Sequence, residues 1–333
     1  MPFLVILGAL GFMLGTGGSA LVAYTLGTGD NKKANEIFSL LIYTLVATGI
    51  VFTIIGIIFI KPISHLLGAD EEMLPYCVKY GRTILIALVP FMLMNIFQSF
   101  LVTAELPHYG LIITIASGVV NVILDALFVA VFKFGVIGAA VATGISQAIG
   151  GFIPLFIFIF SKKSKLHLGR THFSKKALLK SCANGSSEFM SNVAVSLVNM
   201  LYNWQLMKLL GHNGVTSYGV IMYVNYIFLS IFFGYSIGSS PVVGYHYGAG
   251  NTDELKGLFK KSIRIILVSS VVLTLTAELL AAPLSKIFVS YDKDLLKATT
   301  HAFAIYSASF LIAGINIYAL SLIHISEPTR HSL

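Results

Sequence analysis

The chain alternates long apolar stretches with short polar ones. A helix that crosses a bilayer needs about 20 mainly apolar residues. Stretches of about this length or longer occur at residues 1–25, 37–60, 76–104, 110–132, 135–160, 183–210, 215–246, 258–284 and 297–320. Pro90 and Pro154 fall inside two of them, and we expect kinks there because neighbouring helices can satisfy the carbonyl groups that a proline leaves free. The pattern predicts an all-α membrane protein.

One stretch, residues 110–132, contains a single acid, Asp125. An ionised Asp near the middle of a membrane helix costs about 2.5–3.5 kcal/mol on insertion scales, so we expect it to face the protein interior. Asn121 lies four residues earlier, which puts both side chains on one helix face. The pair is a candidate site for an ion or a proton. The alternative is a polar pair that only packs two helices together.

Composition excludes a soluble globular protein. Hydrophobic residues make up 56% of the chain and charged residues 11%, and the mean hydropathy is +0.86. Cys77 and Cys182 are too few for a disulfide framework and lack a metal-binding spacing. The net charge of +8 does not indicate nucleic acid, because much of the excess lies in one segment between helices.

That segment, residues 161–181, contains seven basic residues and no acid, so the positive-inside rule places it in the cytoplasm. They are Lys162, Lys163, Lys165, Arg170, Lys175, Lys176 and Lys180. The loops that hold Lys32 and Lys256 fall on the same side. Acids gather in the expected outer loops, at Asp70, Glu71, Glu72, Asp292 and Asp294.

An internal repeat divides the chain into two related halves. Residues 17–29 recur as residues 238–250, an offset of 221, and the same offset pairs Phe38 with Phe259 and Asn95 with Asn316. In this register one helix of the first half would precede Met1, and two helices of the second half would follow the end of the chain. We therefore expect a fragment with about nine of twelve helices, in two six-helix bundles related by a pseudo-two-fold axis along the membrane normal.

The expected domains follow from the repeat. They are an N-lobe at residues 1–160, a cytoplasmic inter-lobe loop at 161–181 and a C-lobe at 182–320. Residues 321–333 resemble the translation of a sequencing adapter, and we exclude them from the expected fold.

Asn121, Asp125, the segment 134–147 and the repeated Gly-rich segments together resemble the MATE (multidrug and toxic compound extrusion) family, in particular its bacterial drug exporters. The resemblance extends from Met1 to about Ala319. It implies a monomeric, cofactor-free antiporter of the inner membrane, which exchanges Na⁺ or H⁺ for amphiphilic, often cationic drugs and is not an enzyme.

The resemblance also implies a cation site. The family uses an Asn and an Asp four residues apart on its fifth helix and a Thr eighteen residues later, and Asn121, Asp125 and Thr143 match this pattern. It also uses an Asp on its first helix, which would precede Met1 here. The carboxylate, amide and hydroxyl oxygens of Asp125, Asn121 and Thr143 suit Na⁺, and a buried carboxyl group can instead carry a proton. Gln147, one turn after Thr143, is more often packing than a ligand.

Two further groups are weaker candidates. Glu188 resembles a family acid near the start of the seventh helix, with an interfacial Glu as the alternative. A deformable drug cavity is typical of Met and aromatic side chains, which attract cations and accommodate varied shapes, although core or lipid-facing packing is commoner. The residues that suit such a cavity are Met92, Met94, Phe97, Tyr202, Met222, Tyr223 and Tyr226.

Other classes of protein remain open. Gly27-Thr28-Gly29-Asp30 matches the Gly-x-Gly-Asp pattern of intramembrane aspartyl proteases, but a helix end explains it as well, since the repeat has Asn251 in place of Asp30. A lipid or oligosaccharide flippase of the same superfamily would line its cavity with basic residues, which these spans almost lack. A channel or a structural membrane protein is the third alternative.

Overall fold

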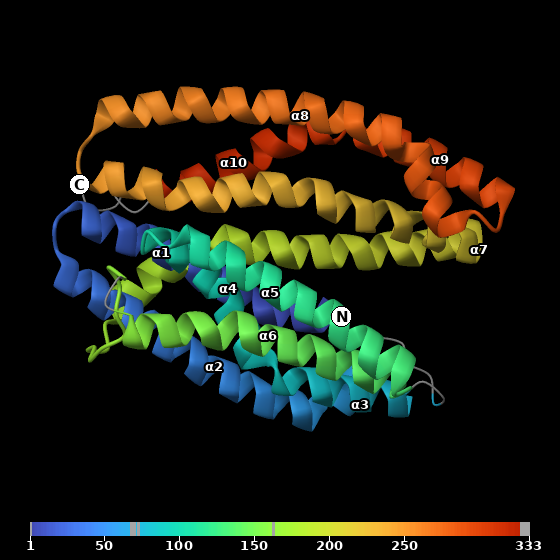
Figure 1. Ribbon diagram of the computed structural model, residues 1–333, viewed down its shortest axis with the longest axis horizontal. Helices are drawn as coiled ribbons and strands as arrows, with labels where there is room; N and C mark the ends of the chain where they lie inside the picture. Colours follow the sequence, from blue (N-terminus) through green and yellow to red (C-terminus); the bar gives the residue numbers. More distant parts are fainter. Residues whose placement is uncertain (1, 67–70, 72–73, 162–163, 327–333) are drawn as a thin grey trace. The chain divides into compact units, whose positions relative to one another are not determined.

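The computed structural model describes residues 2–66, 71, 74–161 and 164–326 (Figure 1). The expectations for Asp70, Glu72, Lys162, Lys163 and residues 327–333 lie outside the described residues. Regular structure in the described ranges is entirely helical, which confirms the all-α prediction. The helices are α1 (Pro2–Gly27), α2 (Asn31–Leu66), α3 (Leu74–Ile86), α4 (Leu88–Thr103), α5 (Pro107–Asp125), the π-helix η1 (Ala126–Val131), α6 (Gly135–Phe160), α7 (Lys175–Gly248), α8 (Thr252–Val289), α9 (Lys293–Ser307) and α10 (Phe310–Ser326).

The chain forms two compact units, Met1–Val193 and Ala194–Leu333. The division falls inside α7, later than the expected boundary at residue 182, because the first turns of α7 pack against α1. The helix α7 is itself two helices joined at Gly211, whose φ of 63° and ψ of −151° are not helical. This break separates the two stretches expected at residues 183–210 and 215–246.

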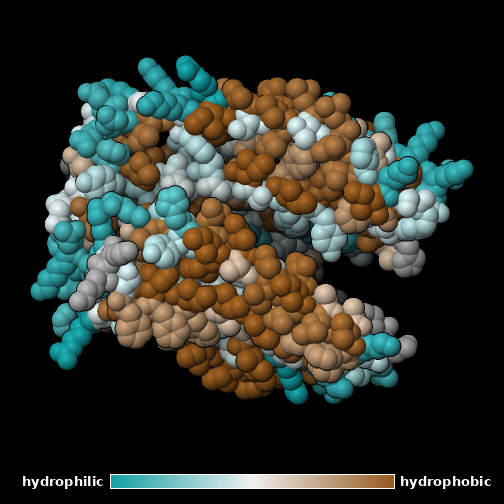
Figure 2. Space-filling model, in the orientation of Figure 1, coloured by the Kyte–Doolittle hydropathy of each residue, from teal (hydrophilic) through white to brown (hydrophobic). Residues whose placement is uncertain are grey.

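Six of the described helices are long and apolar enough to cross a membrane, or up to eight if each bent pair counts as one span. They agree with eight of the nine predicted stretches. The ninth, residues 183–210, is helical but is not among these candidates, since it contains polar residues such as Asn184, Glu188 and Asn192. In Figure 2 apolar residues cover the long sides of the helices in view and hydrophilic residues gather at their ends.

Each unit contains one sharply bent helix pair. The axes of α3 and α4 differ by 50° across Ala87. Pro90 accounts for this bend, because it lacks an N–H group and its ring crowds the carbonyl group of Ile86, four residues earlier. The axes of α9 and α10 differ by 48° across Ala308 and Ser309, where there is no proline. Ala308 follows Ala87 by the repeat offset of 221 residues.

The repeated glycine segments form the same turn in each unit. Gly29 and Gly250 adopt left-handed φ angles of 87° and 72°, which glycine tolerates best. After each glycine a backbone N–H bonds back into the preceding helix, from Asp30 to Thr25 O at 3.3 Å and from Asn251 to His246 O at 3.0 Å. These are Schellman turns at helix ends.

Asp30 stabilises the start of α2. Its Oδ1 accepts a hydrogen bond from the backbone N–H of Lys33 at 3.0 Å, which is the role of a residue that caps a helix N-terminus. The Gly-x-Gly-Asp pattern is therefore explained by a helix end.

Aromatic packing fills the core of the first unit. Phe38 packs edge-on against Phe100 with ring centroids 4.9 Å apart, and Phe97 stacks on Phe158 at 5.3 Å. All four side chains are fully buried. They hold α2, α4 and α6 together, which positions α6 for the site described below.

A close helix contact in the first unit lies between α1 and the start of α7. A Cβ atom added to Gly17 would overlap the carbonyl oxygen of Ser181, and one added to Gly185 would overlap that of Met13. The two backbones therefore touch without intervening side chains, as small residues allow between membrane helices.

We predict that Gly185→Ala destabilises the protein. The added methyl group must displace the backbone of Met13, and overpacking of this kind costs about 1–3 kcal/mol. Thermal unfolding of the purified protein in detergent should show a lower midpoint. Gly118→Ala in α5 is the matched control, since nothing lies within 4 Å of its added Cβ. Equal midpoints for the two variants would contradict the close contact of α1 and α7.

Candidate functional site

The helix α5 has an exposed, mainly apolar face and a buried face. Most of its exposed side chains are apolar, and Leu111, Ile112 and Val122 each expose more than 60% of their surface. The buried face begins with Ile113 and Ser117. Asn121 and Asp125 continue that face at four-residue intervals and are half-buried. The acid of α5 therefore lies on the side that packs against protein.

Both side chains of this pair contain buried polar atoms without a hydrogen bond. Asp125 Oδ1 and Asn121 Nδ2 have no hydrogen-bond partner within the described ranges, and the same holds for Gln147 Oε1. Most buried polar atoms in proteins are hydrogen-bonded, so an unpaired one requires an explanation, such as a bound ion. The amide of Asn121 can present its oxygen instead of its nitrogen by turning over.

A hydrogen bond marks the register between α5 and α6. The hydroxyl of Ser117 donates to the carbonyl oxygen of Ser146 at 2.6 Å. The short connection at residues 132–134 makes the two helices antiparallel, so each step along α5 is matched by a step back along α6. Asn121 is therefore level with Ala142, one residue before Thr143. Asp125 lies about one turn further, towards the start of α6, and Gln147 lies in the opposite direction.

A π-helix begins immediately after the acid. The segment η1 covers Ala126–Val131, and the N–H of Phe132 bonds to the carbonyl oxygen of Leu127, five residues earlier, at 2.9 Å. Segments of this kind widen a helix and often occur at functional sites. The sequence Ala-Leu-Phe-Val-Ala-Val contains no signal for it.

Sequence reasoning missed Tyr80. This residue lies on α3, and its phenol interacts electrostatically with Asp125. The surroundings of Asp125 thus include α3 as well as α5 and α6. Because Tyr80 is 45 residues before Asp125 and in a different helix, neither periodicity nor spacing linked the two.

The donor set fits a small, hard cation. A carboxylate, an amide and a hydroxyl supply oxygen ligands of the kind that Na⁺ accepts. Asp125 forms no ion pair with any described residue, so one monovalent cation or one proton would neutralise it. In the part of the chain that the structure describes, no three His, Cys, Asp or Glu side chains cluster as metal ligands.

The weaker candidates have different surroundings. Glu188 is half-buried in the early turns of α7, where its carbonyl oxygen accepts a hydrogen bond from Asn192 Nδ2 at 2.7 Å. Met92 and Phe97 are fully buried in the core of the first unit. Both side chains pack with the other hydrophobic residues of that core. Met94 lies against Gly150 of α6.

Tyrosines of the second unit form a hydrogen-bonded group. The hydroxyl of Tyr218 donates to Asn199 Oδ1 at 2.6 Å, and Asn199 Nδ2 donates to the hydroxyl of Tyr226 at 3.2 Å. The ring of Tyr202 stacks on that of Tyr218 at 5.3 Å. Tyr223 is 69% exposed outside this group, and Met222 packs against the core of the unit.

We predict that cysteines at Asn121 and Thr143 form a disulfide when the protein is oxidised, because the two positions are within one residue of being level on facing helices. The pair Asn121→Cys and Gln147→Cys should cross-link far less, since Gln147 is about 6 Å further along α6. Both pairs are built in a Cys77→Ser, Cys182→Ser background and compared by thiol labelling. Equal cross-linking of both pairs would contradict the register.

Comparison with known proteins points to one family. The MatE family model matches residues 1–127 and 189–324, well over half of the chain. The multidrug export protein MepA of Staphylococcus saprophyticus is 26% identical over 333 residues, which cover 99% of this chain and 73% of that protein. MepA of Staphylococcus aureus strain MSSA476 is 25% identical over 333 residues, which again cover 99% of this chain and 73% of that protein.

The fold has solved relatives. The outward-facing conformation of a multidrug resistance MATE family transporter of the MOP superfamily matches with a TM-score of 0.90 at 19% identity, over 98% of this chain and 73% of that one. A similarity at this level of identity concerns the fold alone.

Proposed function

Because this chain belongs to the MatE family, we propose that it is a secondary transporter that moves a cation inward and an amphiphilic, often cationic drug outward. The chain is a multi-pass membrane protein. The observation that carries the proposal is the buried carboxylate oxygen of Asp125, which accepts no hydrogen bond from any residue that the structure describes and lies next to a π-helix in a membrane-spanning segment.

In this proposal Asp125, Asn121 and Thr143 bind the coupling ion, Na⁺ or H⁺. An ion that binds more tightly in one of two conformations shifts their populations by its differential affinity and by nothing else. Neutralising Asp125 changes the cost of burying it, so the ion favours whichever conformation buries the carboxylate more deeply. A drug that prefers the other conformation is then exchanged for the ion.

The substrate class is supported by the relatives and by charge. The MepA proteins are named as multidrug exporters. The carboxylate and the tyrosine group of the second unit both attract cations, the latter through aromatic faces. Tyr202, Tyr218 and Tyr226 are therefore the residues of that unit that we assign to drug binding.

We further propose two six-helix lobes related by a pseudo-two-fold axis, with residues 161–181 in the cytoplasm and the lobes in the inner membrane. Three observations support the lobes: the family model matches two separate segments, the Schellman turns recur at Gly29 and Gly250, and the bends recur at Ala87 and Ala308. The basic composition of residues 161–181 supports the orientation.

We predict that Asp125→Asn abolishes ion-coupled efflux of ethidium. The amide is close in size to the carboxylate but is neutral, so ion binding no longer changes its charge. Cells or vesicles that contain the variant should retain ethidium as the vector control does, while the amount of inserted protein stays the same by immunoblot.

Asp253→Asn is the matched control. The side chain of Asp253 is 98% exposed at the start of α8. Ethidium efflux by this variant should equal that of the parent protein. Undiminished efflux by Asp125→Asn would remove Asp125 from the coupling mechanism. Efflux by the parent protein, measured with and without Na⁺, identifies the coupling ion. Efflux that requires Na⁺ assigns Na⁺, and efflux that is independent of Na⁺ assigns H⁺.

A further inference from the structure

We propose that residues 164–176, here called the basic strap, form a binding surface for the headgroups of anionic phospholipids. The strap connects α6 to the first turn of α7. This inference does not depend on the exchange activity proposed above.

The strap is fixed to one face of α2 by its backbone. The N–H of His167 donates to Asn35 Oδ1 at 2.6 Å, and the N–H of Gly169 donates to Ser39 Oγ at 3.0 Å. The hydroxyl of Tyr43 donates to the carbonyl oxygen of Gly169 at 3.1 Å. Asn35, Ser39 and Tyr43 are four residues apart, so they form one row along the helix. A row of polar side chains thus holds the strap in an extended conformation.

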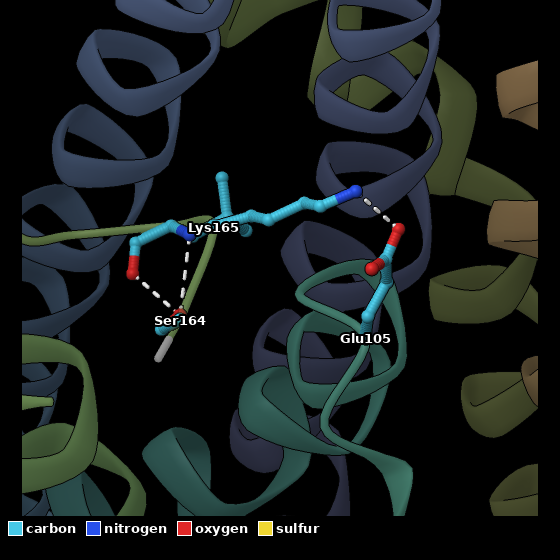
Figure 3. Close-up of polar contacts among 4 residues, drawn as sticks. Glu105, Ser164 and Lys165 are labelled. Atoms are coloured by element: carbon cyan, nitrogen blue, oxygen red, sulfur yellow. Dashed lines mark hydrogen bonds and ion pairs between the residues drawn. The ribbon is translucent and has the colours of Figure 1, made fainter. Parts of the chain in front are cut away.

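The extended conformation sorts the first residues of the strap into two faces. Arg170 is exposed, and over residues 164–167 burial alternates: Ser164 and Leu166 are buried, whereas Lys165 and His167 are exposed. This is the period of two that extended backbone imposes. The hydroxyl of Ser164 donates to the carbonyl oxygen of Leu166 at 2.7 Å, which tightens the inner side (Figure 3).

The acids near the strap do not neutralise it. Lys165 Nζ pairs with Glu105 Oε1 at 2.5 Å, on the turn between α4 and α5 (Figure 3). Glu36 is half-buried, and its carbonyl oxygen accepts a hydrogen bond from the hydroxyl of Thr171 at 2.7 Å. The basic side chains that form no ion pair with any described residue are Arg170, Lys175, Lys176 and, at the adjacent start of α2, Lys32 and Lys33.

An exposed aromatic side chain accompanies these charges. Phe173 is 76% exposed and lies between Arg170 and Lys175 in sequence. Exposure of a large apolar ring to water is unfavourable, but a ring beside cations suits the boundary between lipid headgroups and acyl chains. The span of α6 ends at Phe160, just before the strap, so the strap begins at the membrane surface.

Anionic phospholipid satisfies both features at once. Four to eight basic residues at the end of a membrane helix attract acidic lipid headgroups, and acyl chains accept the ring. A free phosphate ion would satisfy the charges alone. Because the strap is hydrogen-bonded in place, its binding should depend on its conformation and not only on its total charge.

The test places a fluorescent reporter in the strap. Trp204 is the only tryptophan of the chain, so Phe173→Trp in a Trp204→Phe background reports on the strap alone. The full chain is reconstituted with brominated phosphatidylglycerol or brominated phosphatidylcholine at equal mole fraction. We expect quenching at least twofold stronger with phosphatidylglycerol. Equal quenching by both lipids would overturn the proposal.

Charge variants separate the strap from other basic residues. Arg170→Gln, Lys175→Gln and Lys176→Gln together should remove the preference for phosphatidylglycerol. Lys61→Gln, Lys79→Gln and Arg82→Gln remove as many charges at the far end of α2 and on α3, and should leave the preference unchanged. A preference that survives the first triple variant, or disappears in the second, would refute the strap as the binding surface.

Two further arms test the strap's conformation and the kind of ligand. The double variant Asn35→Ala, Ser39→Ala keeps all charges but removes two of the hydrogen bonds that hold the strap on α2. It should at least halve the preference for phosphatidylglycerol over phosphatidylcholine. An unchanged preference would indicate diffuse attraction and overturn an ordered site. Inorganic phosphate, added at constant ionic strength, should not reduce the quenching by brominated phosphatidylglycerol. A reduction would overturn the lipid proposal and assign the surface to free phosphate.

Discussion

The structure is organised around the cost of a carboxylate in a bilayer. Asp125 lies in a helix whose opposite face exposes large apolar side chains, and its Oδ1 is buried without a hydrogen bond to any described residue. Lipid cannot solvate this group, and no basic residue of the described chain pairs with it. The cost is met by turning this face towards protein and, in the proposed mechanism, by a cation. A group that is stable only when neutralised is suited to coupling.

Local departures from regular helix surround this group. The π-helix η1 follows Asp125 directly, and the bend at Ala87 interrupts the α3–α4 pair, which includes Tyr80. In a membrane, irregular backbone is tolerated where protein or a polar cavity satisfies it. Discontinuous helices in corresponding positions of two halves commonly mark transport sites. The equivalent bend at Ala308 is close in sequence to Tyr306, whose phenol interacts with the tyrosine group of the second unit.

Contacts outside the site hold the first unit in register. Backbone contact between α1 and α7 at Gly17 and Gly185 joins the start of α7 to the first unit. The basic strap runs back along α2 before α7 begins. A segment that composition describes only as a basic loop is thus an ordered part of the structure. Its charge follows the positive-inside rule, whereas its conformation comes from the polar row on α2.

The sequence alone determined the helices, the repeat and the i,i+4 pair of Asn121 and Asp125, because hydrophobic periodicity and local spacing are properties of neighbouring residues. It also placed a bend near Pro90. Only the tertiary structure decided the bend at Ala308, the π-helix, the proximity of Tyr80 and the burial of Met92. These depend on which helices pack together, and side chains far apart in sequence set that packing. The register of α5 on α6, marked by the hydrogen bond from the hydroxyl of Ser117 to the carbonyl oxygen of Ser146, likewise depends on packing between helices.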